Sequence, residues 1–86
     1  MASKASIVAA IESKISTTRY SIWRIGLTND PKQRKEDWEN PKYWSQWAAD
    51  SLSDAQDIES DFINKGMKGG TGGDLSSRYT TYVYVF

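Results

Sequence analysis

The stretch RIGLTNDPKQRKEDW, residues 24–38, joins the end of a β-strand to the start of a helix. Tyrosine, isoleucine and tryptophan are concentrated over residues 19–28, which predicts a strand there. Both faces of this segment carry apolar side chains, which favours a central position in a sheet. Asp30 can cap the helix that follows, and Pro31 suits its first position. The junction therefore predicts a mixed α and β fold.

Helices are predicted on both sides of this junction. Residues 3–16 carry isoleucine at every fourth position, which forms a single apolar stripe. Residues 31–65 form a helical region of three segments. Asn40 and Pro41 end the first segment and start a second, and the third stops at Gly66. The second segment carries the aromatic residues Tyr43, Trp44 and Trp47.

The C-terminal part is predicted to be a glycine-rich loop, residues 66–78, followed by a strand, YTTYVYVF, at residues 79–86. The predicted order is α-β-α-α-α-β within one domain, residues 1–86. The expected fold class is α+β, with helices that cover a small sheet. Two strands seldom stand alone, so we expect a third short strand in the loops, pairing with a second copy, or support from the tryptophan-rich helices.

The composition narrows the chemistry that this chain can perform. It contains no cysteine and no histidine, which excludes disulfides, thiolate metal sites and a histidine base. Eleven basic residues balance eleven acidic ones, whereas nucleic-acid-binding domains usually carry a basic excess. No apolar run approaches the ~20 residues of a membrane span, and the N-terminus does not resemble a signal peptide. A cytoplasmic location without a membrane partner is expected.

Short motifs around the junction resemble those of the GIY-YIG nuclease family. Gly26, Thr28 and Arg34 follow the spacing of the family's glycine, threonine and helical arginine. Farther along, Ala55 and Glu59 in DAQDIESDFI are similar to the alanine and the metal-binding glutamate of the family's second conserved helix. These motifs span about half of the chain.

The resemblance implies a site in which Arg34 stabilises a phosphate group and Glu59 holds one Mg²⁺ ion. Tyr20, Arg24 and Thr28 are further expected binding residues. This hypothesis needs Arg34 and Glu59 at one common cleft. Arg24 replaces the motif's tyrosine, and the family's first strand is absent. The resemblance therefore implies a catalytically degenerate domain that binds nucleic acid or a phosphate-containing ligand. Any activity would be that of a metal-dependent endonuclease.

Two other features extend this hypothesis. The C-terminal strand can take the place of the missing first strand, which would bring Tyr82 or Tyr84 inward. The glycine-rich loop can grip an anion such as phosphate through its backbone N–H groups, together with Lys65 and Lys68.

The alternative hypothesis is a non-enzymatic protein-interaction module that self-associates as a homodimer. The neutral net charge and the missing motif tyrosine favour it. On this interpretation Arg34 is an i, i+3 ion-pair partner of Asp37, or an i, i+5 neighbour of Glu39, on an exposed helix. Binding would then use aromatic side chains among Trp38, Tyr43, Trp44 and Trp47.

Overall fold

The structure of the protein is a computed structural model that describes residues 2–16, 18–70 and 75–86. Within these residues the chain forms three α-helices: α1 (Lys4–Ile15), α2 (Pro31–Asp37) and α3 (Leu52–Asn64). A short 3-10 helix, η1 (Tyr20–Ile22), precedes the strands. The described residues form one sheet of four strands: β1 (Arg24–Thr28), β2 (Ser45–Ala48), β3 (Lys68–Gly69) and β4 (Tyr82–Val85). The α+β class predicted from the sequence is confirmed.

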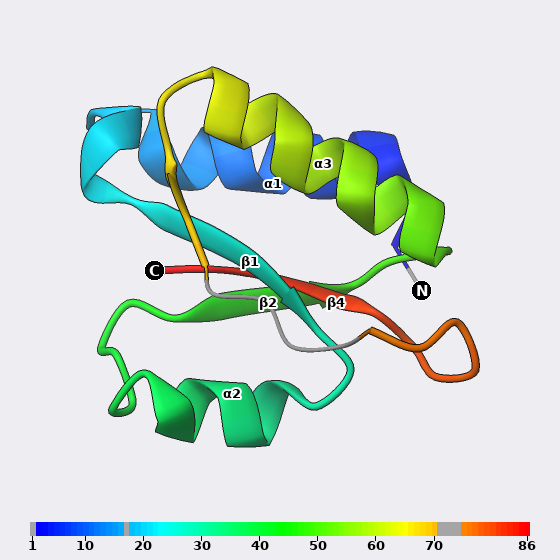
Figure 1. Ribbon diagram of the computed structural model, residues 1–86. Coiled ribbons are helices and arrows are strands. Elements are labelled where there is room, and N and C mark those ends of the chain that lie inside the picture. The colour runs from blue at the N-terminus through cyan, green and yellow to red at the C-terminus, as the bar shows by residue number, and fades with distance from the viewer. Residues whose placement is uncertain (1, 17, 71–74) are drawn as a thin grey trace.

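The strands form one mixed sheet in the order β2-β4-β1-β3. β4 pairs antiparallel with β1 and with β2, while β3 pairs parallel with β1. β1 therefore has a neighbour on each side, which confirms the predicted central strand. Helices α1 and α3 cover one face of the sheet, and α2 lies on the other face (Figure 1). The sheet is thus the middle layer of three.

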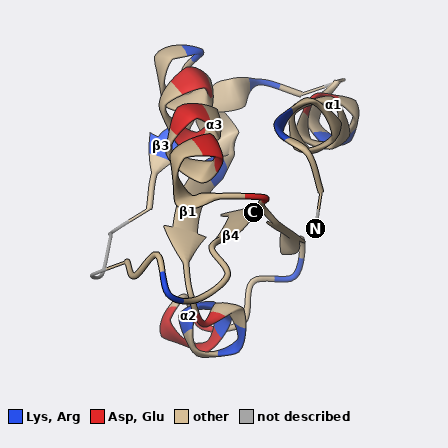
Figure 2. Cartoon of the chain, turned by 90° about the vertical axis from the view of Figure 1, so that its right-hand side faces the viewer, with Lys and Arg blue, Asp and Glu red and all other residues tan. Residues whose placement is uncertain are grey.

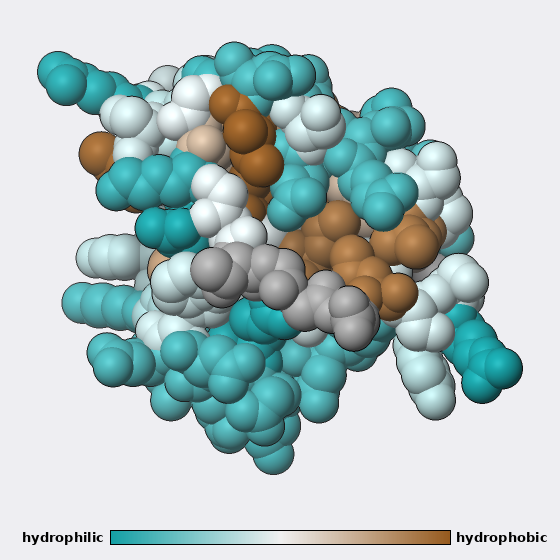
Figure 3. Space-filling view, viewed as in Figure 1, coloured by the Kyte–Doolittle hydropathy of each residue, from teal (hydrophilic) through white to brown (hydrophobic). Residues whose placement is uncertain are grey.

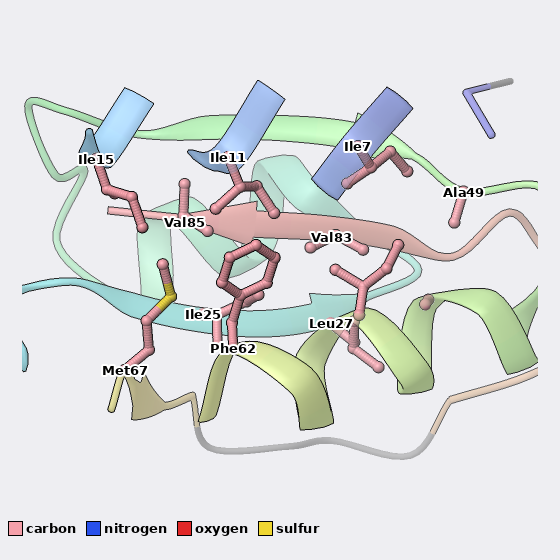
Figure 4. Packing of buried hydrophobic residues seen from close by; sticks show 12 residues of the cluster. Ile7, Ile11, Ile15, Ile25, Leu27, Ala49, Phe62, Met67, Val83 and Val85 are labelled. Atoms are coloured by element: carbon pink, nitrogen blue, oxygen red, sulfur yellow. The ribbon is translucent and has the colours of Figure 1, made fainter. Parts of the chain in front are cut away.

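The hydrophobic core lies between the sheet and the helices α1 and α3 (Figure 4). The predicted isoleucine stripe of α1 is buried, and so are Ala55, Ile58 and Phe62 of α3. The sheet contributes Ile25 and Leu27 from β1 and Val83 and Val85 from β4. Side chains alternate between the two faces of a strand, so the residues between these four face α2. Gly26 and Tyr84 are among them.

The prediction of a helix after Pro41 is wrong. Glu39 and Asn40 have positive φ angles of 64° and 53°, so the chain reverses after α2. Ser45–Ala48 then form β2, which pairs with β4. Alternate residues of β2 face opposite sides of the sheet, so Trp44 and Trp47, three residues apart, lie on opposite faces of the sheet and not together on one helical face. Pairing with the distant β4 overrides the local helix signal.

Other predicted segments have different bounds. The first part of the predicted strand 19–28 forms η1, in which the Trp23 N–H donates to the Tyr20 carbonyl oxygen at 3.0 Å. The C-terminal strand is confined to β4. The predicted loop 66–78 contains β3, which is the short additional strand that was one of the alternatives. Residues 71–74 of that loop lie outside the described residues.

Candidate functional site

The α2 side of the sheet carries a layer of aromatic rings, here termed the aromatic layer: Trp38, Trp44, Tyr84 and Phe86. The rings of Trp44 and Tyr84 are within 9° of parallel, and their centroids are 4.5 Å apart. The ring centroid of Phe86 lies 5.5 Å from that of Trp44 and 5.3 Å from that of Trp38, and the planes of the Trp38 and Phe86 rings make an angle of 55°. Such pairs contribute about 0.5–1.5 kcal/mol each beyond the area that they bury. The aromatic layer therefore packs this face of the sheet independently of the main core.

Tyr84 is fully buried above two glycines. Its register partner on β1 is Gly26, and a Cβ added there would lie 2.3 Å from the Tyr84 hydroxyl oxygen. A Cβ added to Gly70 would lie 2.5 Å from the same atom. The hydroxyl oxygen accepts a hydrogen bond from Nε1 of Trp38 at 3.2 Å. Close approach of the ring, rather than a special backbone angle, thus explains why Gly26 has no side chain.

Arg24 connects the sheet with the aromatic layer. Its guanidinium carbon lies 4.7 Å from the centroid of the Trp38 ring. Nη1 of Arg24 also donates a hydrogen bond to the carbonyl oxygen of Gly69 on β3. Stacking on a ring and donation in the plane of the guanidinium are both geometries that arginine favours. Arg24 therefore ties β3 and the end of α2 to β1.

A polar cavity of about 200 Å³ lies where β1 leads into α2. Two of the predicted site residues, Thr28 and Arg34, share its wall with two carboxylates and two amides; the lining residues are Thr28, Asn29, Asp30, Gln33, Arg34 and Asp37. The surface of α2 is hydrophilic (Figure 3), and α2 carries both basic and acidic residues (Figure 2). The cavity thus has more acidic than basic side chains, which disfavours a phosphate ligand.

The polar groups of this wall bind one another. The Thr28 hydroxyl oxygen accepts from the Asp30 N–H at 3.0 Å, and the Asp30 carboxylate accepts from the Gln33 N–H at 3.1 Å. Nε2 of Gln33 donates to Asp37 at 3.0 Å. Nε of Arg34 lies 3.7 Å from Oδ2 of Asp37. The i, i+3 ion pair between Arg34 and Asp37, which the protein-interaction hypothesis predicted, is therefore present. This pattern is that of a capped helix with an i, i+3 ion pair.

Glu59 lies on α3, half-buried beside the core. Burial raises the pKa of its carboxyl group above the ordinary value. Because α2 and α3 lie on opposite faces of the sheet (Figure 1), the sheet separates Glu59 from Arg34. The two side chains do not meet at the common cleft that the nuclease hypothesis requires. Among the residues that the structure describes, no cluster of three or more Asp, Glu, His or Cys side chains could hold a metal ion.

The other three predicted binding residues lie at a distance from the polar cavity in the fold. Tyr20 is in η1, with its ring centroid 6.2 Å from that of Phe62 on α3. Nζ of Lys65 lies 3.3 Å from Asp61 and 3.7 Å from Glu12, so two carboxylates balance its charge. Lys68 is exposed on β3. These residues therefore line the α3 and β3 side of the molecule, apart from Thr28 and Arg34.

Sequence reasoning missed Asn29, whose side chain fastens the segment before β4 to the end of β1. Its Nδ2 donates to the carbonyl oxygens of Thr80 at 3.0 Å and Ser76 at 3.2 Å. Its Oδ1 accepts from the Ser76 N–H at 2.8 Å. Asparagine in a turn is a signal for side-chain to backbone hydrogen bonds, but the sequence does not reveal partners 47 residues away.

Sequence reasoning also missed the outer edge of β2. The Ala49 N–H donates to the Thr81 carbonyl oxygen at 2.9 Å, so the odd-numbered residues of β2 bond to β4. The backbone groups of Gln46 and Ala48 must therefore point outward. The Ala48 carbonyl oxygen accepts from the Ala2 N–H at 2.8 Å, whereas no described residue bonds to the backbone of Gln46. The sheet thus has an open edge at Gln46, near the start of β2.

Comparisons with models of known protein families, with curated proteins and with solved structures found no match. In the described part of the chain, no helix has the length and apolar character that crossing a membrane requires. The function is therefore inferred from the geometry of this molecule alone.

Proposed function

We propose that this protein is a non-enzymatic protein-interaction module that binds an extended segment along the outer edge of β2. The observation that carries the proposal is the outward-facing backbone N–H and carbonyl group of Gln46, to which no described residue bonds. Such an edge can accept a further strand through main-chain hydrogen bonds, which is a recurrent mode of peptide recognition.

The side chains of β2 support this proposal. Natural proteins protect open edges with lysine, proline, bulges or very short strands. The other edge strand, β3, has two residues and begins with Lys68, so it carries such protection. β2 has four residues, SQWA, with neither a charge nor a proline. Trp44 and Trp47 are half-buried beside it, and Tyr43 is 65% exposed. Aromatic side chains of this kind are enriched where proteins bind one another.

The charges of the molecule also favour a protein ligand over a phosphate. The net charge is zero, and Arg34 and Lys65 both lie beside carboxylates. Arg24 stacks on a tryptophan and donates to a backbone carbonyl oxygen. Phosphate recognition depends on cationic groups that can turn toward the ligand.

The test is a peptide-binding experiment with matched variants at one position. Peptides of seven residues would be selected from a random library on the wild-type protein, and their affinities measured by calorimetry. Gln46→Pro removes the outward N–H and places a ring on the edge, while β4 keeps its hydrogen bonds. Gln46→Ala retains the N–H and is the control.

We expect Gln46→Pro to weaken binding at least tenfold and Gln46→Ala to keep the wild-type affinity within about threefold. Circular dichroism and urea unfolding would establish that both variants are folded. Selected peptides that bind Gln46→Pro as well as the wild type would refute strand addition at β2. The same conclusion would follow if the library yielded no peptide that binds at protein concentrations at which the wild type is monomeric.

A second candidate function is a degenerate GIY-YIG-like nucleic-acid domain with or without Mg²⁺. It is supported by the antiparallel pairing of β4 with β1, which puts Tyr84 opposite Gly26. Tyr84 lies on the same side of the sheet as α2, which carries Arg34. The separation of Arg34 from Glu59 counts against catalysis by both residues at one site.

Incubation of plasmid DNA and oligonucleotides with the protein and Mg²⁺ or Mn²⁺ tests this candidate. Cleavage that Arg34→Ala and Glu59→Gln both abolish would support an endonuclease. DNA binding without cleavage, weakening as salt is raised, would support the degenerate form. Absence of both would refute the candidate without affecting the peptide experiment.

A further inference from the structure

We infer that the segment bound at the β2 edge is β2 of a second copy of this chain, paired antiparallel about a twofold axis at Ser45. This inference rests on the proposed strand addition and specifies its partner. Pairing of this kind joins two four-stranded sheets into one continuous sheet, with α1 and α3 of both copies on the same face.

The outward backbone groups of β2 are self-complementary in one register. Gln46 faces the open edge, since it lies between Ser45 and Trp47, which pair with β4. Trp44 directly precedes β2, and its Nε1 donates to Oε1 of Gln46 at 2.8 Å, so the two side chains lie on the same face of the sheet. An axis at Ser45 sets Trp44 of each copy opposite Gln46 of the other. Each such pair exchanges both of its N–H···O bonds in an antiparallel ladder. The backbone groups at this edge are therefore satisfied without any change in the rest of the sheet.

The N-terminal segment excludes the neighbouring register. An axis at Gln46 would set Trp44 of one copy opposite Ala48 of the other, and Ala48 would have to supply its carbonyl oxygen. That oxygen already accepts from the Ala2 N–H at 2.8 Å. Ala2 also forms a parallel bridge with Ala49, so it blocks this end of the edge. The contact with Ala2 thus limits pairing to the part of the edge that is centred on Ser45.

Side chains at the edge suit a copy of the same strand. A twofold axis brings each residue close to its own equivalent, so a charge near the axis would repel itself. Residues 44–46 are neutral, and Ser45 at the axis is small. The β3 edge differs, because Lys68 would repel its equivalent there. A stable dimer buries about 1,200–2,000 Å² in total, and the rings of Tyr43, Trp44 and Trp47 are the apolar surface beside this edge.

The absence of cysteine allows a direct test of the register. In an antiparallel sheet centred on Ser45, the two Ser45 residues form a non-hydrogen-bonded pair, with Cα atoms about 4.5 Å apart. A disulfide spans Cα distances of about 4.4–6.8 Å, so Ser45→Cys would cross-link the dimer on mild oxidation. Ser60→Cys, at an exposed position on α3, is the matched control.

We expect Ser45→Cys to become mostly covalent dimer on non-reducing gels, and Ser60→Cys to remain at least tenfold less cross-linked. In sedimentation velocity, the wild type and Gln46→Ala should dimerise as concentration rises, while Gln46→Pro remains monomeric. Ser45→Cys should give the same dimer under reducing conditions.

A wild-type protein that is monomeric at millimolar concentration, or a dimer that Gln46→Pro retains, would overturn the inference. So would cross-linking of Ser45→Cys no greater than that of Ser60→Cys. The peptide experiment is independent of these results when it is carried out at concentrations at which the protein is monomeric. Peptides that bind the edge of a monomeric protein would leave strand addition intact and refute only the second copy as partner. Failure of both experiments would refute both.

Discussion

Replacing Asn29 with alanine tests whether one side chain holds the segment before β4 in place. The asparagine makes three hydrogen bonds of 3.2 Å or less to backbone groups of Ser76 and Thr80. These bonds are partly buried, and alanine would remove all three. A typical intramolecular hydrogen bond contributes about 0.5–1.5 kcal/mol net, so we expect the free energy of unfolding to fall by about 2–4 kcal/mol. In a domain of this size that corresponds to a fall in Tm of roughly 10–25 °C.

The measurement is urea unfolding followed by tryptophan fluorescence, with thermal unfolding followed by circular dichroism. Asn29→Asp keeps the acceptor for the Ser76 N–H but sets a carboxylate against two carbonyl oxygens. It should therefore destabilise the protein as well. Gln33→Ala is the control, because it removes one exposed side-chain hydrogen bond to Asp37 and should change stability by no more than about 0.5 kcal/mol. Equal stabilities of Asn29→Ala and Gln33→Ala would refute the reasoning.

Three other predictions concern the sheet and α3. Gly26→Ala should lower the free energy of unfolding by about 1–3 kcal/mol in urea titrations, since its Cβ would lie 2.3 Å from the tyrosine hydroxyl oxygen above it. Gly69→Ala, with 3.5 Å to the nearest atom, should change it little. Burial raises the pKa of Glu59, so the folded state retains this proton to higher pH than the unfolded state does. The free energy of unfolding should therefore fall as pH rises from the pKa of Glu59 in the unfolded state to its raised pKa in the folded state. Glu59→Gln should be more stable than the wild type at pH 7 and equal to it below about pH 4. Ser45→Pro, which removes a bond to β4, should lower the urea midpoint more than Gln46→Pro does, and equal midpoints would contradict the assigned edge.

The two candidate functions differ in which face of the molecule they use. Strand addition uses the β2 edge and the aromatic side chains beside it. The nuclease-like candidate uses the polar cavity at the end of β1, where Thr28 and Arg34 lie together. Gln46→Pro should therefore leave any DNA binding unchanged, and Arg34→Ala should leave peptide binding unchanged.

The sequence predicted the features that depend on short-range spacing. Isoleucines at every fourth position placed one face of α1 in the core, because residues four apart share a helical face. The Asp30 carboxylate caps α2, with Pro31 at its first position, as the local pattern indicated. The β-branched and aromatic residues of the C-terminal segment predicted the strand that became β4. In each case the signal lies within a few residues of the feature.

Only the tertiary structure decided how these elements meet. Residues 45–48, after Pro41, form β2 because they pair with β4 through backbone hydrogen bonds. Nothing in the sequence near Pro41 indicates that this distant segment is their partner. The separation of Arg34 from Glu59 follows from the faces of the sheet that α2 and α3 cover, which motif spacing does not specify. The open edge likewise depends on the strand order, because hydrogen bonds between distant segments determine which backbone groups remain exposed.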